Sequence, residues 1–150
     1  MSELDHRFHQ LSAGTCRQRL ERGSIGRVGW SNQKGPQILP VTYLLHDDNI
    51  VFRTDPHGPL AKLQGGEPAV FEVDEFDPTT RCGWSVVVHG RAYSTQRSQR
   101  ATQLWREADP VPWAGGQRPL FISITLDELS GRSVERHRED VDDDEDPVWR

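Results

Sequence analysis

Short apolar stretches alternate with turn residues along most of this chain, and this pattern predicts a protein built mainly of β-strands. The period-two alternation is clear at residues 69–73, where Phe71 and Val73 would share one face of a strand. Strands are expected at residues 25–30, 37–45, 49–54, 69–73, 84–93 and 120–126. The loop at residues 31–36 and the turn at residues 46–48 would join the first three strands into a meander.

Helical spacing of apolar residues occurs in two longer segments. Cys16 and Leu20 lie four apart within residues 13–22, and Gly23 follows as a stop signal. The stripe in the second segment, residues 96–108, consists of Ala101, Leu104 and Trp105. A third, very short helix is expected at residues 59–63. The absence of βαβ alternation predicts an α+β fold, a mostly antiparallel closed barrel of six or seven strands with two or three short helices.

The charge is distributed unevenly along the chain. The net charge is −5, but seven of the 23 acidic residues lie within residues 139–150, beside a single basic residue. The rest of the chain is nearly neutral, which argues against a nucleic-acid-binding surface, because such a surface needs a concentrated basic stripe. We therefore expect one domain over residues 1–138 and an acidic, disordered tail over residues 139–150.

The cysteine and hydropathy patterns indicate in which cellular compartment the protein is expected. Cys16 and Cys82 form no Cys-x-x-Cys pair, so the sequence predicts neither a disulfide framework nor a metal site. No apolar run approaches membrane-spanning length, and residues 1–5 do not resemble a signal peptide. We expect a soluble, cytoplasmic protein with no membrane partner.

Two catalytic motifs are incomplete. Gly83-Trp84-Ser85 is half of a nucleophile elbow, but Val87 replaces the second glycine and the segment is a predicted strand, which argues against a serine hydrolase. His6 and His9 stand at helical spacing near the N-terminus without a third ligand, and we expect both to be solvated.

The predicted strand at residues 49–54 ends on Arg53-Thr54, where a guanidinium, a hydroxyl and the start of the short helix come together. Such a combination suits an oxyanion, above all a phosphate. The alternative is an exposed Arg53 that pairs with Asp55 or Glu72, since surface ion pairs are commoner than phosphate sites.

A second candidate site lies in the Pro/Gly-rich loop at residues 109–116. Trp113 stands in this loop, with Arg118 close behind it. A loop aromatic beside a cation suits either a ligand ring or a subunit interface.

Six segments, taken in order, resemble one family of proteins. They are residues 26–29 (GRVG), 39–43 (LPVTY), 50–54 (IVFRT), 70–74 (VFEVD), 83–92 (GWSVVVHGRA) and 112–116 (PWAGG). Their order and spacing resemble the pyridoxamine 5′-phosphate oxidase-like superfamily of FMN-binding split β-barrels, in particular its small actinobacterial-type members. The resemblance covers residues 11–135.

This resemblance implies a homodimer that holds FMN in the cleft between its subunits. By position, Arg53 and Thr54 would bind the FMN phosphate. Pro40, Val41 and Thr42 would lie along the isoalloxazine ring. Ser85 would take the place of a residue that hydrogen-bonds the flavin, and Trp113 and Arg118 would close the site from the partner subunit.

The chain departs from the family pattern at Pro59. Family members often carry a lysine there, as a second cation for the phosphate. Lys62 lies one turn further along the same short helix and is the expected substitute. With Arg53 as the main cation, affinity for FMN is expected to be low.

Two functional hypotheses follow from the resemblance. The first is an FMN-dependent oxidoreductase that acts on a small-molecule substrate or electron donor, such as a nicotinamide or a deazaflavin. The alternative is a module that binds flavin, deazaflavin or haem without turnover. Oxidation of vitamin B6 is not expected, because the longer C-terminal part of the true oxidases is missing. A weaker possibility is a structural dimer whose acidic tail contacts a basic partner.

Overall fold

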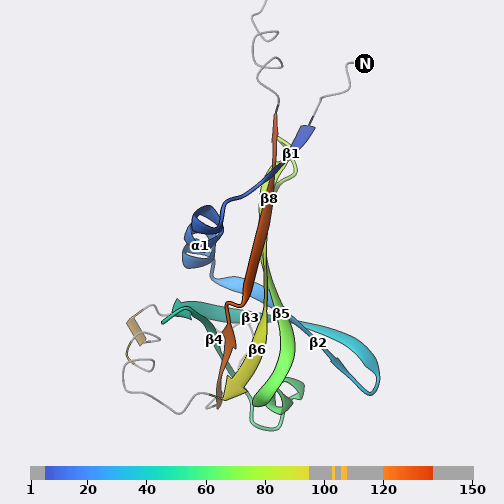
Figure 1. The fold of residues 1–150 in the computed structure, drawn as a ribbon, viewed down its shortest axis with the longest axis vertical. Coiled ribbons are helices and arrows are strands. Elements are labelled where there is room, and N and C mark those ends of the chain that lie inside the picture. Colours follow the sequence, from blue (N-terminus) through green and yellow to red (C-terminus); the bar gives the residue numbers. More distant parts are fainter. Residues whose placement is uncertain (1–5, 95–102, 104–105, 108–119, 137–150) are drawn as a thin grey trace, which may run out of the picture.

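A computed structural model describes residues 6–94, 103, 106–107 and 120–136 of the chain (Figure 1). Eight antiparallel strands form one continuous sheet. The strands are β1 (His6–Gln10), β2 (Ile25–Asn32), β3 (Gly35–His46), β4 (Asn49–Thr54), β5 (Gly65–Asp77), β6 (Cys82–Ser94), β7 (Leu120–Thr125) and β8 (Glu128–Arg136). The helices are α1 (Ala13–Arg22) and the 3-10 helix η1 (Pro59–Lys62).

Six of these strands close into a barrel. The order is β6-β5-β2-β3-β4-β7, and β7 returns to pair with the end of β6. The interior is filled by side chains that point inward from alternate positions, as the period of two requires. The largest fully buried ones include Tyr43, Phe52, Phe71, Ile50, Ile122 and Ile124. The predicted α+β fold with a closed antiparallel barrel is confirmed.

Strand β6 belongs both to the closed barrel and to an outer ribbon of strands. Its first part, Gly83 to His89, pairs with β8, and its last three residues pair with β7. The change of partner occurs around Gly90, where a Cβ atom would lie 1.8 Å from the carbonyl oxygen of Thr125. Only glycine permits that approach. Figure 1 shows the result, in which β8 and β1 extend away from the barrel as a ribbon alongside β5 and β6.

Helix α1 packs beside this ribbon and confirms the predicted helix at residues 13–22 (Figure 1). Ser12 caps its start by accepting a hydrogen bond from the Thr15 N–H, and Cys16 and Leu20 are buried as expected. Its last turn is fixed to the barrel because the buried hydroxyl of Tyr43 donates to the Leu20 carbonyl at 2.7 Å.

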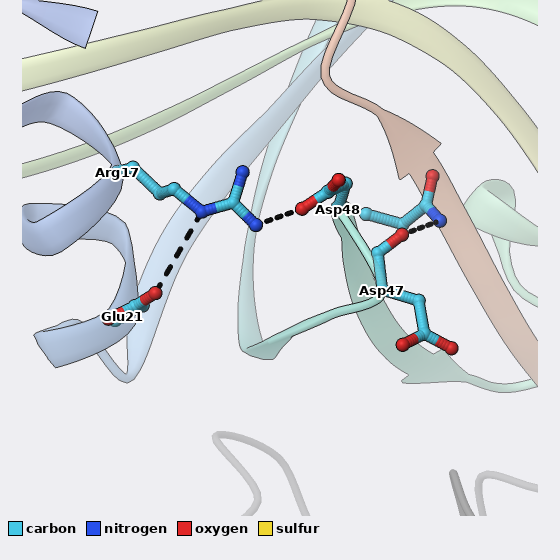
Figure 2. Close-up of polar contacts among 5 residues, drawn as sticks. Arg17, Glu21, Asp47 and Asp48 are labelled. Carbon is cyan, nitrogen blue, oxygen red and sulfur yellow. Dashed lines mark hydrogen bonds and ion pairs between the residues drawn. The ribbon is translucent and has the colours of Figure 1, made fainter. Parts of the chain in front are cut away.

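A second contact joins α1 to the turn between β3 and β4. Figure 2 shows Arg17 between Glu21 and Asp48, and the Arg17 guanidinium forms an ion pair with the Asp48 carboxylate. Asp47 and Asp48 have φ angles of 46° and 60°, the left-handed conformation that a two-residue hairpin turn requires. Asn49 donates to the Asp47 carbonyl at 2.9 Å and tightens the same turn.

Two strands were not predicted. His6 and His9 stand at helical spacing in the sequence, but both lie in strand β1 against β8, and His9 is exposed as expected. The β8 segment was not recognised because it is mostly polar and contains Gly131, so it lacks an apolar run. The predicted helix at residues 96–108 lies largely outside the described residues, as does the acidic tail. No helix among the described residues is long and apolar enough to cross a membrane.

Candidate functional site

Arg53 and Thr54 lie at the end of β4, as predicted. The Arg53 side chain is half-buried, with its Nε atom inaccessible to solvent, and Thr54 is 4% exposed. On one side they pair with Phe121 and Leu120 at the start of β7. The guanidinium is therefore held against the barrel wall and is not the exposed surface arginine of the alternative interpretation.

The strands β3 and β4 separate next to this pair. Within the described residues their pairing ends at Tyr43 and Phe52, although β4 continues to Thr54. Carried further, the same register places Thr42 opposite Arg53 and Val41 opposite Thr54. The predicted ring-lining residues on β3 and the predicted phosphate-binding residues on β4 thus both follow directly on the last pair of this ladder.

The main chain of β3 presents polar groups along this opening. The Tyr43 N–H donates to the Ser24 carbonyl at 3.0 Å, on the β2 side. Because N–H and C=O groups alternate between the two edges of a strand, those of Ile38, Pro40 and Thr42 point away from β2, toward the opening. Pro36 and Pro40 lack an N–H on that side. The edge therefore offers carbonyl oxygens and a smaller number of donors, a pattern that suits the polar edge of a planar heterocycle.

The turn after Thr54 has no spare main-chain donors at residues 56–59. The carboxylate of Asp55 accepts from the His57 N–H at 2.9 Å, and its carbonyl accepts from the Gly58 N–H at 3.0 Å. Pro56 and Pro59 have no N–H at all. The short helix expected after this turn is present as the four-residue 3-10 helix η1. Residues 56–59 therefore leave no main-chain donor for an anion at this strand end.

Lys62 is the second cation near this turn. It lies in the last turn of η1, and its side chain is exposed, whereas Leu60 and Ala61 beside it are buried. Its charge therefore lies on the outside of the helix, in contact with solvent.

Ser85 lies elsewhere. It is half-buried on β6, between Asp74 of β5 and Arg132 of β8. Strands β2 and β5 stand between β3 and β6, so three inter-strand spacings, about 14 Å, separate Ser85 from Thr42. Ser85 faces an open hollow of about 590 Å³, which is lined by Phe8, His9, Gln10, Ser85, Val87, Ser130, Gly131 and Arg132. Trp113 and Arg118 lie outside the described residues.

A charged cluster that the sequence analysis missed lies next to the β3 strand. Arg27 is paired with Pro40 on one side and with Glu72 on the other. Its Nη1 atom is 3.0 Å from Glu72 Oε2 and 3.5 Å from Asp74 Oδ1. Glu72 was proposed as a partner of Arg53, and the structure pairs it with Arg27 instead. No short-range pattern reveals this contact, because it depends on the register of two strands about 45 residues apart.

The environment of Glu72 favours its protonated form. Burial is the main cause, and a hydrogen bond and charge repulsion from Asp74 add to it, while Arg27 acts in the opposite direction. Together they raise the pKa of Glu72 from its ordinary 4.5 to about 7.

The outer face of the sheet carries large exposed apolar side chains. Strand registers place Phe8, Ile25, Ile38 and Phe76 on this common face, together with Arg27 and Glu72. Phe8 is 69% exposed, Ile38 66%, Phe76 60% and Ile25 41%. Exposed apolar patches of this kind mark contact surfaces. Among the described residues, no three His, Cys, Asp or Glu side chains gather in a way that would hold a metal ion.

The closed barrel, the outer ribbon and the strand-end cation define a split-barrel protein with a candidate anion site at its opening. Residues 12–133 match the pyridoxamine 5′-phosphate oxidase family, and the chain belongs to this family. The predicted family membership is confirmed.

The chain is similar in sequence to one further protein and in fold to two solved structures. The uncharacterised protein Rv0080 of Mycobacterium tuberculosis is 27% identical over 111 residues, which are 71% of this chain and 72% of that protein. An FAD-binding protein of Mesorhizobium loti has a similar fold, with a TM-score of 0.72 and 23% identity over 87% of this chain and 99% of its own. An FAD- and haem-binding protein of Mycobacterium smegmatis has a TM-score of 0.64 and 16% identity over 90% of this chain and 80% of its own.

Proposed function

We propose that this protein is a flavin-binding oxidoreductase with its cofactor at the opening between β3 and β4. The isoalloxazine ring would lie along Pro40, Val41 and Thr42, and the phosphate would bind Arg53 and Thr54, with Lys62 as an outer cation. The observation that supports the proposal is the end of the β3–β4 ladder at Tyr43 and Phe52, because both sets of residues follow directly on this last pair.

The residues present fit such a cofactor. A flavin needs a polar main-chain edge beside its ring, and the outward-facing groups of Ile38 and Pro40 supply one. It also needs a cation near its phosphate, and Arg53 supplies that charge from the wall of the barrel. The resemblance favours FMN, whereas the names of two similar structures specify FAD. Both forms share the ring and the first phosphate.

When bound, a flavin supplies transfer of a hydride or of single electrons. The chain's own residues would bind and orient it, and the buried walls of the barrel would exclude water from one side of the ring. Because the flavin would supply the redox chemistry, the protein would need no side chain that acts as an acid or a base. The substrate class is a small molecule, and we do not propose vitamin B6.

We further propose that the working unit is a homodimer. The apolar outer face, with Phe8, Ile25, Ile38 and Phe76, supports a contact with a second copy. Ser85 is too far from Thr42 to touch the same part of a ring bound by its own chain, so we assign its contact with flavin to the ring that the partner binds. Trp113 and Arg118 are assigned to the same partner contribution.

A second candidate is a carrier that binds flavin, deazaflavin or haem without turnover. One observation favours it. Residues 56–59 provide no spare main-chain donor for a phosphate, which lowers the expected affinity for a nucleotide. The name of the M. smegmatis relative, which specifies haem as well as FAD, is consistent with this alternative.

Titration with riboflavin, FMN and FAD, followed by anaerobic addition of a nicotinamide donor and then a reduced deazaflavin, tests the proposal. We expect binding of at least one flavin at tens of micromolar or tighter, roughly −6 kcal/mol, and bleaching of its absorbance near 450 nm by a donor. Binding without bleaching by either donor would favour the carrier. If no flavin binds, both flavin functions fail.

A further inference from the structure

We infer that the hollow between the end of α1 and the ribbon strands β5 and β6, here called the helix-end hollow, binds a small aromatic carboxylate. Its volume is about 440 Å³, which is within the range of small-molecule sites. Its lining includes Arg19, Arg22 and Gly23 at the helix end, Val73 and Glu75 of β5, and Trp84 of β6. No residue of β3 or β4 lines it, so this site does not rest on the proposed flavin function.

The end of helix α1 is fixed against the barrel. The buried Tyr43 hydroxyl donates to the Leu20 carbonyl at 2.7 Å. The Gly23 N–H donates to the Arg19 carbonyl at 3.2 Å and closes the last turn. A Cβ atom on Gly23 would lie 2.2 Å from the Tyr43 hydroxyl oxygen, so glycine alone fits there without moving a buried ring. The main chain that carries Arg19 and Arg22 is therefore held in one position before a ligand arrives.

Two arginines at this helix end have donors that no carboxylate uses. The Arg19 guanidinium carbon lies 5.2 Å from the centroid of the Trp84 ring, a cation–π contact. Stacking occupies the flat face of a guanidinium and leaves the N–H groups along its edge available to an acceptor. Within the described residues neither Arg19 nor Arg22 forms an ion pair, whereas Arg17 of the same helix pairs with Asp48. Two such forks three positions apart on a helix suit a carboxylate.

The strand side of the helix-end hollow combines apolar surface with acidic groups. Val73 is 2% exposed and Trp84 is half-buried, so a flat ring that lies on them leaves water. Glu75 is exposed and stands directly opposite Trp84 in the β5–β6 ladder. Asp74, the other acid of the lining, has its Oδ1 atom 3.5 Å from Arg27 Nη1. Because Glu75 repels anions, a singly charged carboxylate is favoured over a doubly charged phosphate.

Arginines in the last turn of a helix have a simpler role as well. A positive charge there stabilises the carbonyl end of the helix dipole. That role requires neither the stacking of Arg19 on Trp84 nor a hollow beside it, and it predicts no ligand. The two explanations therefore differ in a measurable way.

NMR titration of the isotope-labelled full chain with benzoate, benzamide and phenyl phosphate tests the inference. Benzamide has the shape of benzoate without its charge, and phenyl phosphate carries a larger charge. We expect benzoate to bind about tenfold or more tightly than benzamide, and about threefold more tightly than phenyl phosphate. Benzoate that binds no more tightly than benzamide, or not at all at about 10 mM, would overturn the site. Tighter binding of phenyl phosphate would overturn the choice of a carboxylate.

Variants on helix α1 separate the site from the charge of the helix. Arg22→Gln should weaken benzoate binding by about fivefold or more and leave benzamide within about twofold, because it removes a donor fork and little apolar surface. Arg17→Gln is the matched control, since it removes the same charge from the same helix outside the hollow. It should leave benzoate affinity within about twofold. Equal losses in the two variants would mean that benzoate responds only to overall charge, and the site would be wrong.

Variants on the strands test the opposite wall. Glu75→Gln should raise the affinity for benzoate by about twofold or more, because it removes a repelling charge. In the wild type, benzoate should shift the indole N–H signal of one tryptophan, and that signal should be missing from the spectrum of Trp84→Phe. If the shifted signal persists in Trp84→Phe, the ligand binds elsewhere and the inference is wrong.

Discussion

Arg27 of β2 holds Glu72 of β5 across the sheet, with 3.0 Å between Arg27 Nη1 and Glu72 Oε2. Arg27 is also the direct neighbour of Pro40 in the β2–β3 ladder. One guanidinium thus lies between the strand proposed to line the cofactor ring and a carboxyl group that favours its protonated form. A change of pH near neutrality therefore alters the charge of Glu72, which lies two strands away from the β3 strand proposed to line the cofactor.

The first prediction concerns this pH dependence. The pKa of Glu72 is about 7 in the folded chain against an ordinary 4.5, so its contribution to stability is full below pH 4.5 and is lost as the pH rises through 7. Glu72→Gln resembles the protonated form and does not titrate. The melting temperature of the wild type should therefore fall more steeply between pH 5 and pH 8 than that of Glu72→Gln. Glu75→Gln, an exposed change on the same strand, is the control, and parallel curves for wild type and Glu72→Gln would contradict the argument.

The second prediction concerns the crossing at Gly90. A methyl group there would overlap the Thr125 carbonyl oxygen, which is backbone and cannot rotate away. Gly90→Ala should lower the free energy of unfolding by about 3 kcal/mol or prevent folding, as measured by urea denaturation.

Gly14→Ala is the matched control for Gly90→Ala. Nothing lies within 4 Å of a Cβ at Gly14 in helix α1, so this variant should be as stable as the wild type or more stable by about 0.5–1 kcal/mol. Similar losses in the two variants would mean that the close approach at Gly90 does not decide the fold.

The third prediction concerns the ion pair between Arg17 and Asp48 (Figure 2). Both side chains are partly exposed, so the pair should stabilise the chain by no more than about 1 kcal/mol and should be screened by salt. Asp48→Asn keeps a residue that tolerates the left-handed conformation and removes the charge. Its stability should match that of the wild type in 1 M NaCl and fall below it at low salt.

Asp47→Asn changes the same turn without touching the Arg17 ion pair, so it provides the comparison for Asp48→Asn. A salt-independent difference between wild type and Asp48→Asn would assign the effect to turn conformation.

The fourth prediction concerns the outer face. Ile38 is 66% exposed, and Ile38→Glu places a charge in the surface proposed to meet a second copy. In light-scattering chromatography this variant should elute as a monomer at concentrations where the wild type is a dimer, and its flavin affinity should fall as well. Gln18→Glu adds the same charge on the exposed side of α1 and should leave the dimer intact. A monomeric wild type would remove the basis of the proposed partner contacts.

Much of the barrel was predictable because its strands carry their own signals. Strand β4 was predicted at residues 49–54 and is observed there, since its apolar run is bounded by turn residues on both sides. Strands β1 and β8 carry no such signal. Their pairing joins residues more than 120 positions apart. It depends on the pairing of β8 with β6, and no local sequence pattern indicates it.

The candidate site was predictable to a similar extent. The strand end at Arg53 could be inferred from the sequence, because a strand that stops at a turn exposes its last polar side chains. The use of the His57 and Gly58 N–H groups within the turn could not, since it depends on how Asp55 folds back. The contact between Arg27 and Glu72 likewise required the β2–β5 register.

The two prolines on the open edge of β3 have a consequence for the behaviour of the protein in a crowded solution. An unpaired strand edge is a template on which another chain can add, which is the first step toward fibrils. Pro36 and Pro40 interrupt the row of donors on that edge, so an incoming strand would lose two of the bonds it needs. A small heterocycle makes only a few hydrogen bonds to a strand edge, so the two missing N–H donors weaken its binding little. The opening proposed for the cofactor would therefore also resist the addition of another strand.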